Sequence, residues 1–384
     1  MQLVAYGAQD VYLTGNPQIT FFKVVYRRHT NFSCEDIEQT FNGNADFGRT
    51  VTCNINRNGD LVSNMCIQVT INPAVAEKAD DTYNARAGYA LIESVKIEIG
   101  GSKIDEHTGN WMNIWHELTH DSSHDEGYKH ILGGKTYDIA TVERTFYIPL
   151  QFWFCRNPGL ALPLIALQYH DVRVTVKFNS FANITTVNQS ADTAPTMKDA
   201  ILLTEYVYLD SEERKRFAQA SHEYLIEQVQ DSGAENVTNG STDKYRLNFN
   251  HPCKCLVWVG NNTNKTVFNY TNHNTEANGT NPVDEAVLQL NGHDRFAKRE
   301  GSYFNFIQPQ RHFSNTPADG INVYSFAINP EEHQPSGTCN FSRIDNATLN
   351  IKWNGSVTDS CNIYAVNYNV LRIMSGMGGP AYSN

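Results

Sequence analysis

Two short patterns in this sequence each occur twice, in the same order, and this repetition is the feature that most restricts the possible folds. The segment IEIGGSKID (Ile97–Asp105) resembles LQLNGHDRF (Leu288–Phe296). Further along each half, HDVRVTVKF (His170–Phe178) resembles DNATLNIKW (Asp345–Trp353). The two copies of each pattern are separated by close to half of the 384 residues. Self-similarity in a fixed order predicts a duplicated domain.

The repeated segments have the residue pattern of β-strands with one buried face. Apolar and polar residues alternate in Val95–Ile99, Val172–Phe178 and Leu349–Trp353, as they do in half-buried strands. Hairpin-type turns are predicted at four dipeptides, namely Gly100-Gly101, Asn291-Gly292, Asn58-Gly59 and Asn354-Gly355. A Pro/Gly loop precedes the second repeated strand in both halves, at Asn157–Gly159 and at Pro335–Gly337.

These patterns predict an all-β chain of two tandem antiparallel eight-stranded jelly rolls with short loop helices. Abundant aromatic residues, with 19 Tyr and 19 Phe, favour strands over helices. The predicted division is an N-terminal arm over 1–21, a first jelly roll over 22–209, a linker over 210–221 and a second jelly roll over 222–384. Glu205–Asp210 is the expected last strand of the first unit, and Ser211 is the expected cap of a linker helix. The polar stretches Gly233–Lys244 and Asn261–Pro282 are expected to be exposed loops outside the core.

Charge and cysteine content exclude several classes of protein. The net charge of -11 argues against direct nucleic-acid binding, because the basic clusters Lys23–Arg28 and Arg214–Arg216 are short. No apolar stretch is long enough to suggest a membrane span, and no secretory signal is recognisable. The eight cysteines are therefore expected to be reduced thiols. Cys253 and Cys255, at alternate positions of a predicted strand, are expected to share one face.

The sharpest enzymatic motif is HELTH, formed by His116, Glu117 and His120. An HExxH sequence on a helix brings two imidazoles together for zinc and supplies a glutamate as general base. The third ligand of a metzincin is missing, because Ser123 and Glu126 stand where glycine and histidine are needed. We therefore interpret the motif as structural, in a loop helix that packs Trp111, Ile114, Trp115 and Leu118 inward and has a polar outer face. No catalytic residue, metal site or cofactor is predicted.

Sequons of the form Asn-X-Ser/Thr gather in the polar loops of the second half. Glycosylation is chemically possible at each of them, although Asn- and Thr-rich loops also produce sequons by chance. The candidate sites are Asn236, Asn239, Asn261, Asn264, Asn269 and Asn278.

Nine segments along nearly the whole chain form a recognisable set. The first is the N-terminal stretch MQLVAYGAQDVYLTGNPQITFFKVVYRRHTNF (Met1–Phe32). The others, in order, are Arg57–Val62, Asn157–Val172, His222–Gln228, Arg246–Pro252, Leu288–Phe296, Gly301–Asn305, Gln334–Leu349 and Asn367–Gly379. Together these segments resemble the major capsid proteins of nucleocytoplasmic large DNA viruses, particularly those of algal and amoebal giant viruses.

The resemblance implies a structural subunit of a virion rather than an enzyme. It implies a double jelly roll, a homotrimer with a pseudo-hexagonal outline, and trimers that tile an icosahedral shell beside neighbouring capsomers. It further implies minor capsid proteins beneath the shell, indirect association with an internal viral membrane, no direct nucleic-acid binding, and assembly in the host cytoplasm. We expect Met1–Thr20 to become ordered only against neighbouring subunits, and Leu371–Gly379 to contribute to the contact between subunits.

Three alternatives remain open at this point. The chain could be a minor or penton-type capsid paralogue. It could be a carbohydrate-binding β-sandwich, since jelly rolls also occur in lectins. It could also be a zinc hydrolase that uses HELTH.

Overall fold

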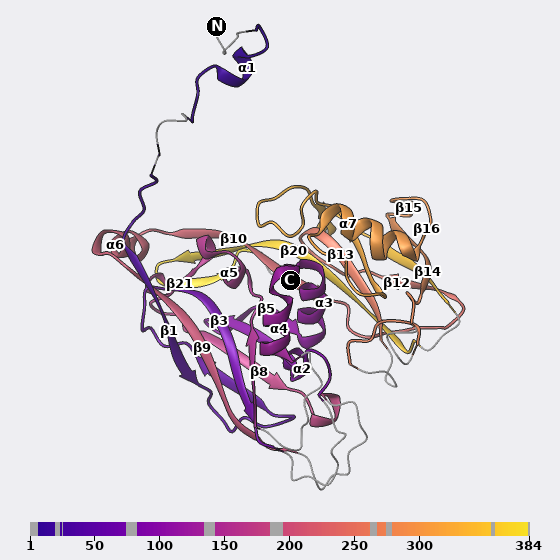
Figure 1. Cartoon of the computed structure of the whole chain (residues 1–384), viewed down its shortest axis with the longest axis horizontal. Helices are drawn as coiled ribbons and strands as arrows, with labels where there is room; N and C mark the ends of the chain where they lie inside the picture. Colours follow the sequence, from indigo (N-terminus) through magenta and orange to yellow (C-terminus); the bar gives the residue numbers. More distant parts are fainter. Residues whose placement is uncertain are drawn as a thin grey trace, which may run out of the picture.

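The computed structural model describes most of the chain and shows two β bodies preceded by an extended arm (Figure 1). The described residues are 7–19, 24, 26–73, 83–133, 143–184, 195–261, 267–273, 279–354 and 358–382. Within the arm, only α1 (Val11–Thr14) is helical among the residues described. None of the helices in these ranges has both the length and the apolar character that a membrane-crossing helix requires.

The first body consists of two antiparallel sheets that enclose a common core. The first sheet has the order β1 (Phe32–Thr40), β9 (Met197–Leu209), β3 (Leu61–Ile71) and β6 (Arg144–Pro149), with the short β7 (Leu162–Pro163) paired to β3. The second sheet has the order β2 (Thr50–Asn54), β8 (Val172–Phe178), β4 (Ile92–Ile99) and β5 (Ser102–Thr108).

The second body also consists of two antiparallel sheets. One has the order β10 (His222–Asp231), β20 (Ser360–Met374), β13 (Pro252–Asn261) and β17 (Ile321–Ser325). The other has the order β12 (Thr242–Arg246), β19 (Ala347–Trp353), β14 (Val283–Leu290) and β15 (His293–Asp294). Four short strands extend these sheets: β11 (Glu235–Asn236), β16 (Arg299–Glu300), β18 (Cys339–Asn340) and β21 (Met377–Pro380).

The two bodies have the same topology. If the eight main strands of each are counted along the chain, both have one sheet in the order 1-8-3-6 and one in the order 2-7-4-5. The repeated sequence patterns occupy equivalent places, since β4 and β5 correspond to β14 and β15, and β8 corresponds to β19. The predicted double jelly roll is therefore confirmed.

The turn between the fourth and fifth strands is also duplicated. Gly100 and Asn291 have φ of 57° and 51°, and the glycines that follow them have φ of 81° and 82°. Two successive left-handed residues form the type I′ hairpin that strand twist favours. Asn58-Gly59, in contrast, is not a hairpin turn, because it joins β2 and β3, which belong to different sheets. Gly355 lies outside the described residues.

Helix α6 (Ser211–Gln219) connects the two bodies, in the place predicted for a linker helix. The predicted cap is wrong by one residue, because the side chain of Asp210 accepts hydrogen bonds from the backbone nitrogens of Glu212 and Glu213 at 3.1 and 3.0 Å. Ser211 is instead the first helical residue. The proposed boundaries of arm, jelly rolls and linker remain a prediction.

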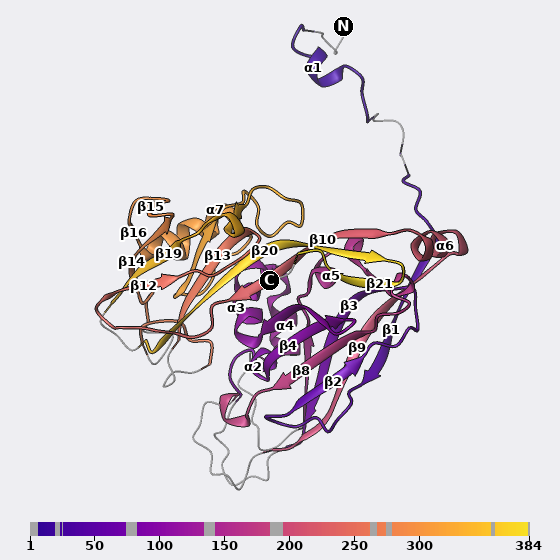
Figure 2. The same cartoon turned by 180° about the vertical axis from the view of Figure 1, so that it is seen from behind.

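Helices are inserted between the fifth and sixth strands of both jelly rolls. In the first they are α3 (Gly109–Thr119) and α4 (Asp125–Leu132), and in the second the π-helix η6 (Tyr303–Ile307) followed by α7 (Gln308–His312). Figures 1 and 2 place α3 and α4 between the two bodies and α7 on the second body. The remaining α-helices described are α2 (Ala87–Ala90) and α5 (Trp153–Arg156).

Both polar stretches predicted to lie outside the core contain more structure than expected. Gly233–Lys244 includes β11 and the start of β12. In Asn261–Pro282, residues Asn269, Tyr270 and Thr271 are buried. The Tyr270 hydroxyl donates to Asn110 Oδ1 at 2.6 Å, which ties this loop to α3. Loop composition therefore misled the prediction, because one aromatic ring with a hydrogen-bonded hydroxyl is enough to anchor a polar segment.

Gly109 begins α3 at a point where a larger residue does not fit. A Cβ added there would collide with the carbonyl oxygens of Tyr89 and Ile92, whereas one added at the exposed Gly127 in α4 would meet nothing within 4 Å. We predict that Gly109→Ala lowers the free energy of unfolding by about 1–3 kcal/mol through overpacking. Gly127→Ala should raise it by about 0.5–1 kcal/mol. Denaturant unfolding followed by circular dichroism measures both changes in the free energy of unfolding. Equal changes for the two substitutions would contradict the steric role assigned to Gly109.

Candidate functional site

The contact surface between the two jelly rolls, here called the seam, gathers most of the chemically notable residues of the chain. Helix α3 forms its centre, and Thr108 caps the helix by accepting from the Trp111 backbone nitrogen at 3.1 Å. Trp111, Ile114, Trp115 and Leu118 are buried, as predicted. Their partners lie on the outer face of the β10-β20-β13-β17 sheet: Cys255, Val257, Val259, Ile321, Val323, Tyr364 and Val366. The helix of one jelly roll therefore packs on the sheet of the other.

The HELTH residues lie at the C-terminal end of α3, where His120 is the C-cap. The His116 ring stacks on the His120 ring at 4.5 Å and meets Tyr128 edge-on at the same distance. Glu117 forms an ion pair with Arg86 and accepts from the Ala318 backbone nitrogen at 3.3 Å. In the part of the chain that the structure describes, no group of three His, Cys, Asp or Glu residues could hold a metal ion.

The environment of His116 is that of a packed interior residue. Burial, followed by the charges of Arg86 and His120, lowers the pKa of His116 to about 3. The imidazole is therefore neutral at pH 7, and it packs against the rings of Tyr89, His120 and Tyr128, which favours the structural interpretation of the motif. One part of the prediction is wrong, because His116 and Glu117 are buried rather than part of a polar outer face. The loop helix lies between two domains, so both of its faces are covered.

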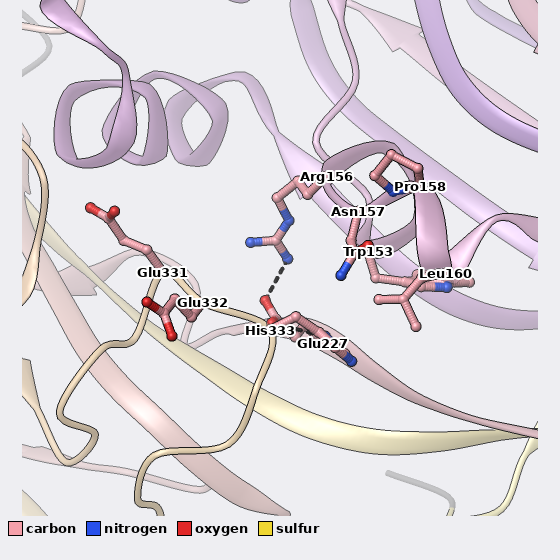
Figure 3. Close-up of a pocket in the computed structure, with 9 residues that line it drawn as sticks. All are labelled: Trp153, Arg156, Asn157, Pro158, Leu160, Glu227, Glu331, Glu332 and His333. Atoms are coloured by element: carbon pink, nitrogen blue, oxygen red, sulfur yellow. Dashed lines mark ion pairs between the residues drawn. The ribbon is translucent and has the colours of Figure 1, made fainter. Parts of the chain in front are cut away.

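An ion cluster within the seam surrounds Glu227 on β10. Its carboxylate lies 2.8 Å from Arg156 of the first jelly roll and 2.9 Å from Lys254 on β13. His333 Nδ1 lies 3.4 Å from the same carboxylate. Figure 3 shows the ion pair between Arg156 and Glu227. Both residues line a cavity of about 250 Å³, which Trp153 and Leu160 also line. The cluster joins the two jelly rolls electrostatically.

Burial makes this cluster energetically significant. Lys254 is 0% exposed, and Glu227 is almost completely buried. Burial alone would raise the pKa of Glu227, but Arg156, His333 and Lys254 lower it to about 2. Burial lowers the pKa of Lys254, although Glu227 opposes that effect. Arg156 and Lys254 each also have an aromatic neighbour within their own jelly roll, since Arg156 lies 5.0 Å from the Trp115 ring centre and Lys254 lies 5.1 Å from that of Tyr368.

A β-bulge at Lys254 overturns the prediction for the two neighbouring cysteines. Cys253 pairs with Asn367 and Cys255 with Val366, so the ladder advances by one residue on β20 while it advances by two on β13. The extra residue changes the face of the sheet to which the following side chains of β13 point. Cys253 therefore lies in the core of the second jelly roll, and Cys255 lies in the seam. All eight cysteines are free thiols, as predicted.

The C-terminal strands β20 and β21 pack against the first jelly roll of the same chain. Leu371 and Ile373 are buried in its core cluster. The Gly378 carbonyl lies 2.9 Å from His170 Nδ1, and a Cβ added at Gly378 would lie 2.6 Å from Leu167. The glycines of this tail do permit close backbone approach, but the approach described is within the chain rather than between subunits.

The candidate glycosylation sites differ in accessibility. Asn236 and Asn239 are exposed, whereas Asn261 is half-buried and donates to Asn362 Oδ1 at 2.8 Å. Asn269 is buried, and its amide nitrogen, the atom that would carry a glycan, donates to the His273 carbonyl at 3.0 Å. Asn264 and Asn278 lie outside the described residues. Burial therefore disfavours Asn269, and glycosylation at the other sites stays a prediction.

Sequence reasoning did not identify the ion cluster. Lys254 was the available signal, because a lysine within the apolar run CKCLVWV must either be exposed at an edge or find a buried partner. Its partner Glu227 could not be inferred, since it lies 27 residues away on a strand two positions across the sheet.

The cluster predicts a large difference between two glutamates on the same strand. Glu227→Gln leaves Lys254 and Arg156 without their buried anion, so the free energy of unfolding should fall by about 3–5 kcal/mol. Glu223 is the matched control, because its pair with Arg372 is more than half exposed on both sides. Glu223→Gln should cost less than about 1 kcal/mol. Thermal unfolding of both variants at pH 7 tests this, and similar losses would show that the cluster does not hold the seam.

Two family models match the chain in succession. "Major capsid protein N-terminus" matches residues 20–210, and "Large eukaryotic DNA virus major capsid protein" matches residues 213–379. Their limits fall on either side of the start of α6.

Individual proteins agree with the family models. The chain is 50% identical to the major capsid protein of Pyramimonas orientalis virus, over all of this chain and 99% of that one. It is 42% identical to the major capsid protein of Paramecium bursaria Chlorella virus 1, with the same coverage. The PBCV-1 virus capsid structure superimposes with a TM-score of 0.84 at 37% identity, covering 95% of this chain and 100% of that one. The Faustovirus major capsid protein, at 14% identity and a TM-score of 0.76, shares the fold. These matches place the chain in the major capsid protein family of large eukaryotic DNA viruses.

Proposed function

We propose that three copies of this chain form a capsomer with a pseudo-hexagonal outline, and that such capsomers tile an icosahedral virion shell. The observation that carries the proposal is the identical strand order of the two jelly rolls within one chain. Three chains then present six similar units around one axis, which allows close packing in a plane. The chain works through shape and association, and we propose that it catalyses no reaction.

The seam supports this role because a subunit that packs into a regular shell needs a fixed angle between its two jelly rolls. Domains that share a chain usually have modest interfaces and move relative to each other. Here two tryptophans and a buried ion cluster hold the domains together. Any other orientation of the two jelly rolls would break these contacts and expose apolar surface and unpaired charge. The seam therefore favours a single relative orientation.

The further partners follow from the family relationship. We propose contacts with neighbouring capsomers and with minor capsid proteins beneath the shell, indirect association with an internal membrane, and assembly in the host cytoplasm. Direct binding of nucleic acid is not part of the proposal, since the net charge is -11.

The oligomeric state tests the central claim. Sedimentation velocity of the purified chain should give a species of three times the 43.3 kDa chain mass, and negative-stain electron microscopy should show a hexagonal outline. A monomer at concentrations of tens of micromolar, or a dimer, would contradict the proposed capsomer.

The N-terminal arm is proposed to act after trimers have formed. Tyr12, Leu13 and Ile19 are each more than 85% exposed, so the isolated chain gives these apolar side chains no partner among the described residues. We predict that deletion of Met1–Thr20 leaves the trimer intact and reduces shell assembly, because only contacts to neighbours are lost. Sedimentation reports the trimer, and electron microscopy of assembly reactions reports shells. Loss of the trimer in the deletion variant would contradict this order of events.

A further inference from the structure

The strand pair β13–β18 brings two cysteines opposite each other in the second jelly roll. The two strands run antiparallel, and Cys253 is the direct partner of Cys339. Both side chains pack in the core cluster of this jelly roll, so they point to the same face of the sheet. Directly opposed residues of antiparallel strands have Cα atoms about 4.5–5.5 Å apart. This separation lies within the range of about 4.4–6.8 Å that a disulfide requires.

No other cysteine in the described strand registers has a cysteine as its partner. Cys155 lies in α5 rather than in a strand. The other pairings are Cys34 with Val207, Cys53 with Val174, Cys66 with Pro149 and Leu203, Cys255 with Ser325 and Val366, and Cys361 with Glu235 and Gly260. The strand pairing therefore singles out one pair among the eight free thiols.

The two thiols differ in exposure, which gives each a separate part in an oxidation. Cys253 is 0% exposed, whereas Cys339 is half-buried and can meet a dissolved oxidant. Burial raises the pKa of the Cys253 thiol well above its ordinary value. Burial also raises the pKa of Cys339, but the charge of the exposed Arg295 opposes this effect. Because the thiolate is the attacking form, Cys339 is the first of the two to react.

The loop between β17 and β18 covers the ion cluster of the seam. The Glu332 carbonyl accepts from Lys254 Nζ at 3.1 Å, and His333 Nδ1 lies 3.4 Å from the Glu227 carboxylate. The Tyr368 hydroxyl donates to the His333 carbonyl at 2.9 Å. Any bond that fixes the end of this loop therefore also fixes part of the seam.

The end of the loop is held by little backbone structure. Strand β18 has 2 residues, and Pro252, opposite Asn340, has no backbone N–H to donate. Gly337 and Thr338, just before β18, are exposed. Segments with few backbone hydrogen bonds and high exposure open at a low cost in free energy. A covalent bond at Cys339 would close this weak point.

We propose that Cys253 and Cys339 form a redox-sensitive lock, which is a pair of free thiols in a reducing cytosol and a disulfide once the folded protein meets an oxidising medium. Disulfides are rare in the cytosol but persist on virion surfaces and in other oxidising surroundings. The lock goes beyond the proposed capsomer and does not depend on it, because both cysteines belong to one jelly roll.

The oxidant is a small disulfide of the glutathione type, and the reaction proceeds by two exchange steps. The Cys339 thiolate attacks one sulfur of the small disulfide, the S–S bond breaks, and the departing thiolate takes up the proton that Cys339 lost. Cys253 then loses its proton and attacks the Cys339 sulfur, which releases the second small thiol. The two cysteines lose two electrons in total, and the small disulfide is reduced to two thiols.

Oxidised glutathione added to the folded, purified chain at about pH 8 tests the bond. Thiol titration in denaturant should show two thiols fewer than the eight of the reduced chain. Peptide mapping by mass spectrometry should find the Cys253 peptide linked to the Cys339 peptide. Because the bond closes a long loop, the midpoint of thermal unfolding should rise by at least about 5 °C. Dithiothreitol should reverse all three changes.

Three variants separate this pair from the remaining thiols. Cys339→Ser should unfold like the reduced wild type and gain no stability on oxidation. Cys253→Ala should stop at the intermediate, with one glutathione retained on Cys339; if this variant does not fold, Cys339→Ser carries the test. Cys361→Ala is the matched control, because Cys361 is buried in the same core but has no cysteine opposite. It should still lose two thiols.

Hydrogen exchange tests the connection to the seam. Oxidation should slow exchange of the amides in Ile328–Ser336 by at least about tenfold, because the loop end no longer opens. The Gly100-Gly101 hairpin, in the other jelly roll, should exchange at an unchanged rate. Equal rates for the loop in the reduced and oxidised chain would overturn its link to the seam.

Two results would overturn the lock itself. One is an unchanged thiol count in the folded chain after oxidation. The other is a disulfide between different cysteines, such as Cys66 and Cys155, which lie near each other in the first jelly roll.

Discussion

The docking of α3 on the outer face of the β10-β20-β13-β17 sheet is the contact on which the arrangement of the chain depends. Each jelly roll has its own core, so neither needs the other to bury most of its strands. The relative orientation of the two is set where Trp111, Ile114, Trp115 and Leu118 meet the second sheet. Large aromatic side chains on a helix fit a sheet surface in few ways. All copies of the chain have the same shape only if this fit allows a single orientation of the two jelly rolls.

The ion cluster adds specificity to that apolar contact. A buried ion pair often contributes little net stability compared with an apolar replacement, but an unpaired buried charge is strongly unfavourable. Lys254 is held inside the protein by a bulge, and its anion Glu227 is shared with Arg156 from the other jelly roll. A slipped seam would separate Arg156 from Glu227 while leaving both poorly hydrated. The cluster therefore penalises incorrect arrangements more than it strengthens the correct one.

Strand periodicity and internal repetition predicted the fold because both can be recognised in the sequence without knowing which strands pair. The alternation in Val172–Phe178 and its copy in Leu349–Trp353 matches the buried faces of β8 and β19. The errors arise where a partner strand or another domain determines the outcome. Cys253 and Cys255 face opposite sides because of a bulge defined against β20. His116 is buried because a second domain covers its helix, and no pattern within HELTH indicates that neighbour.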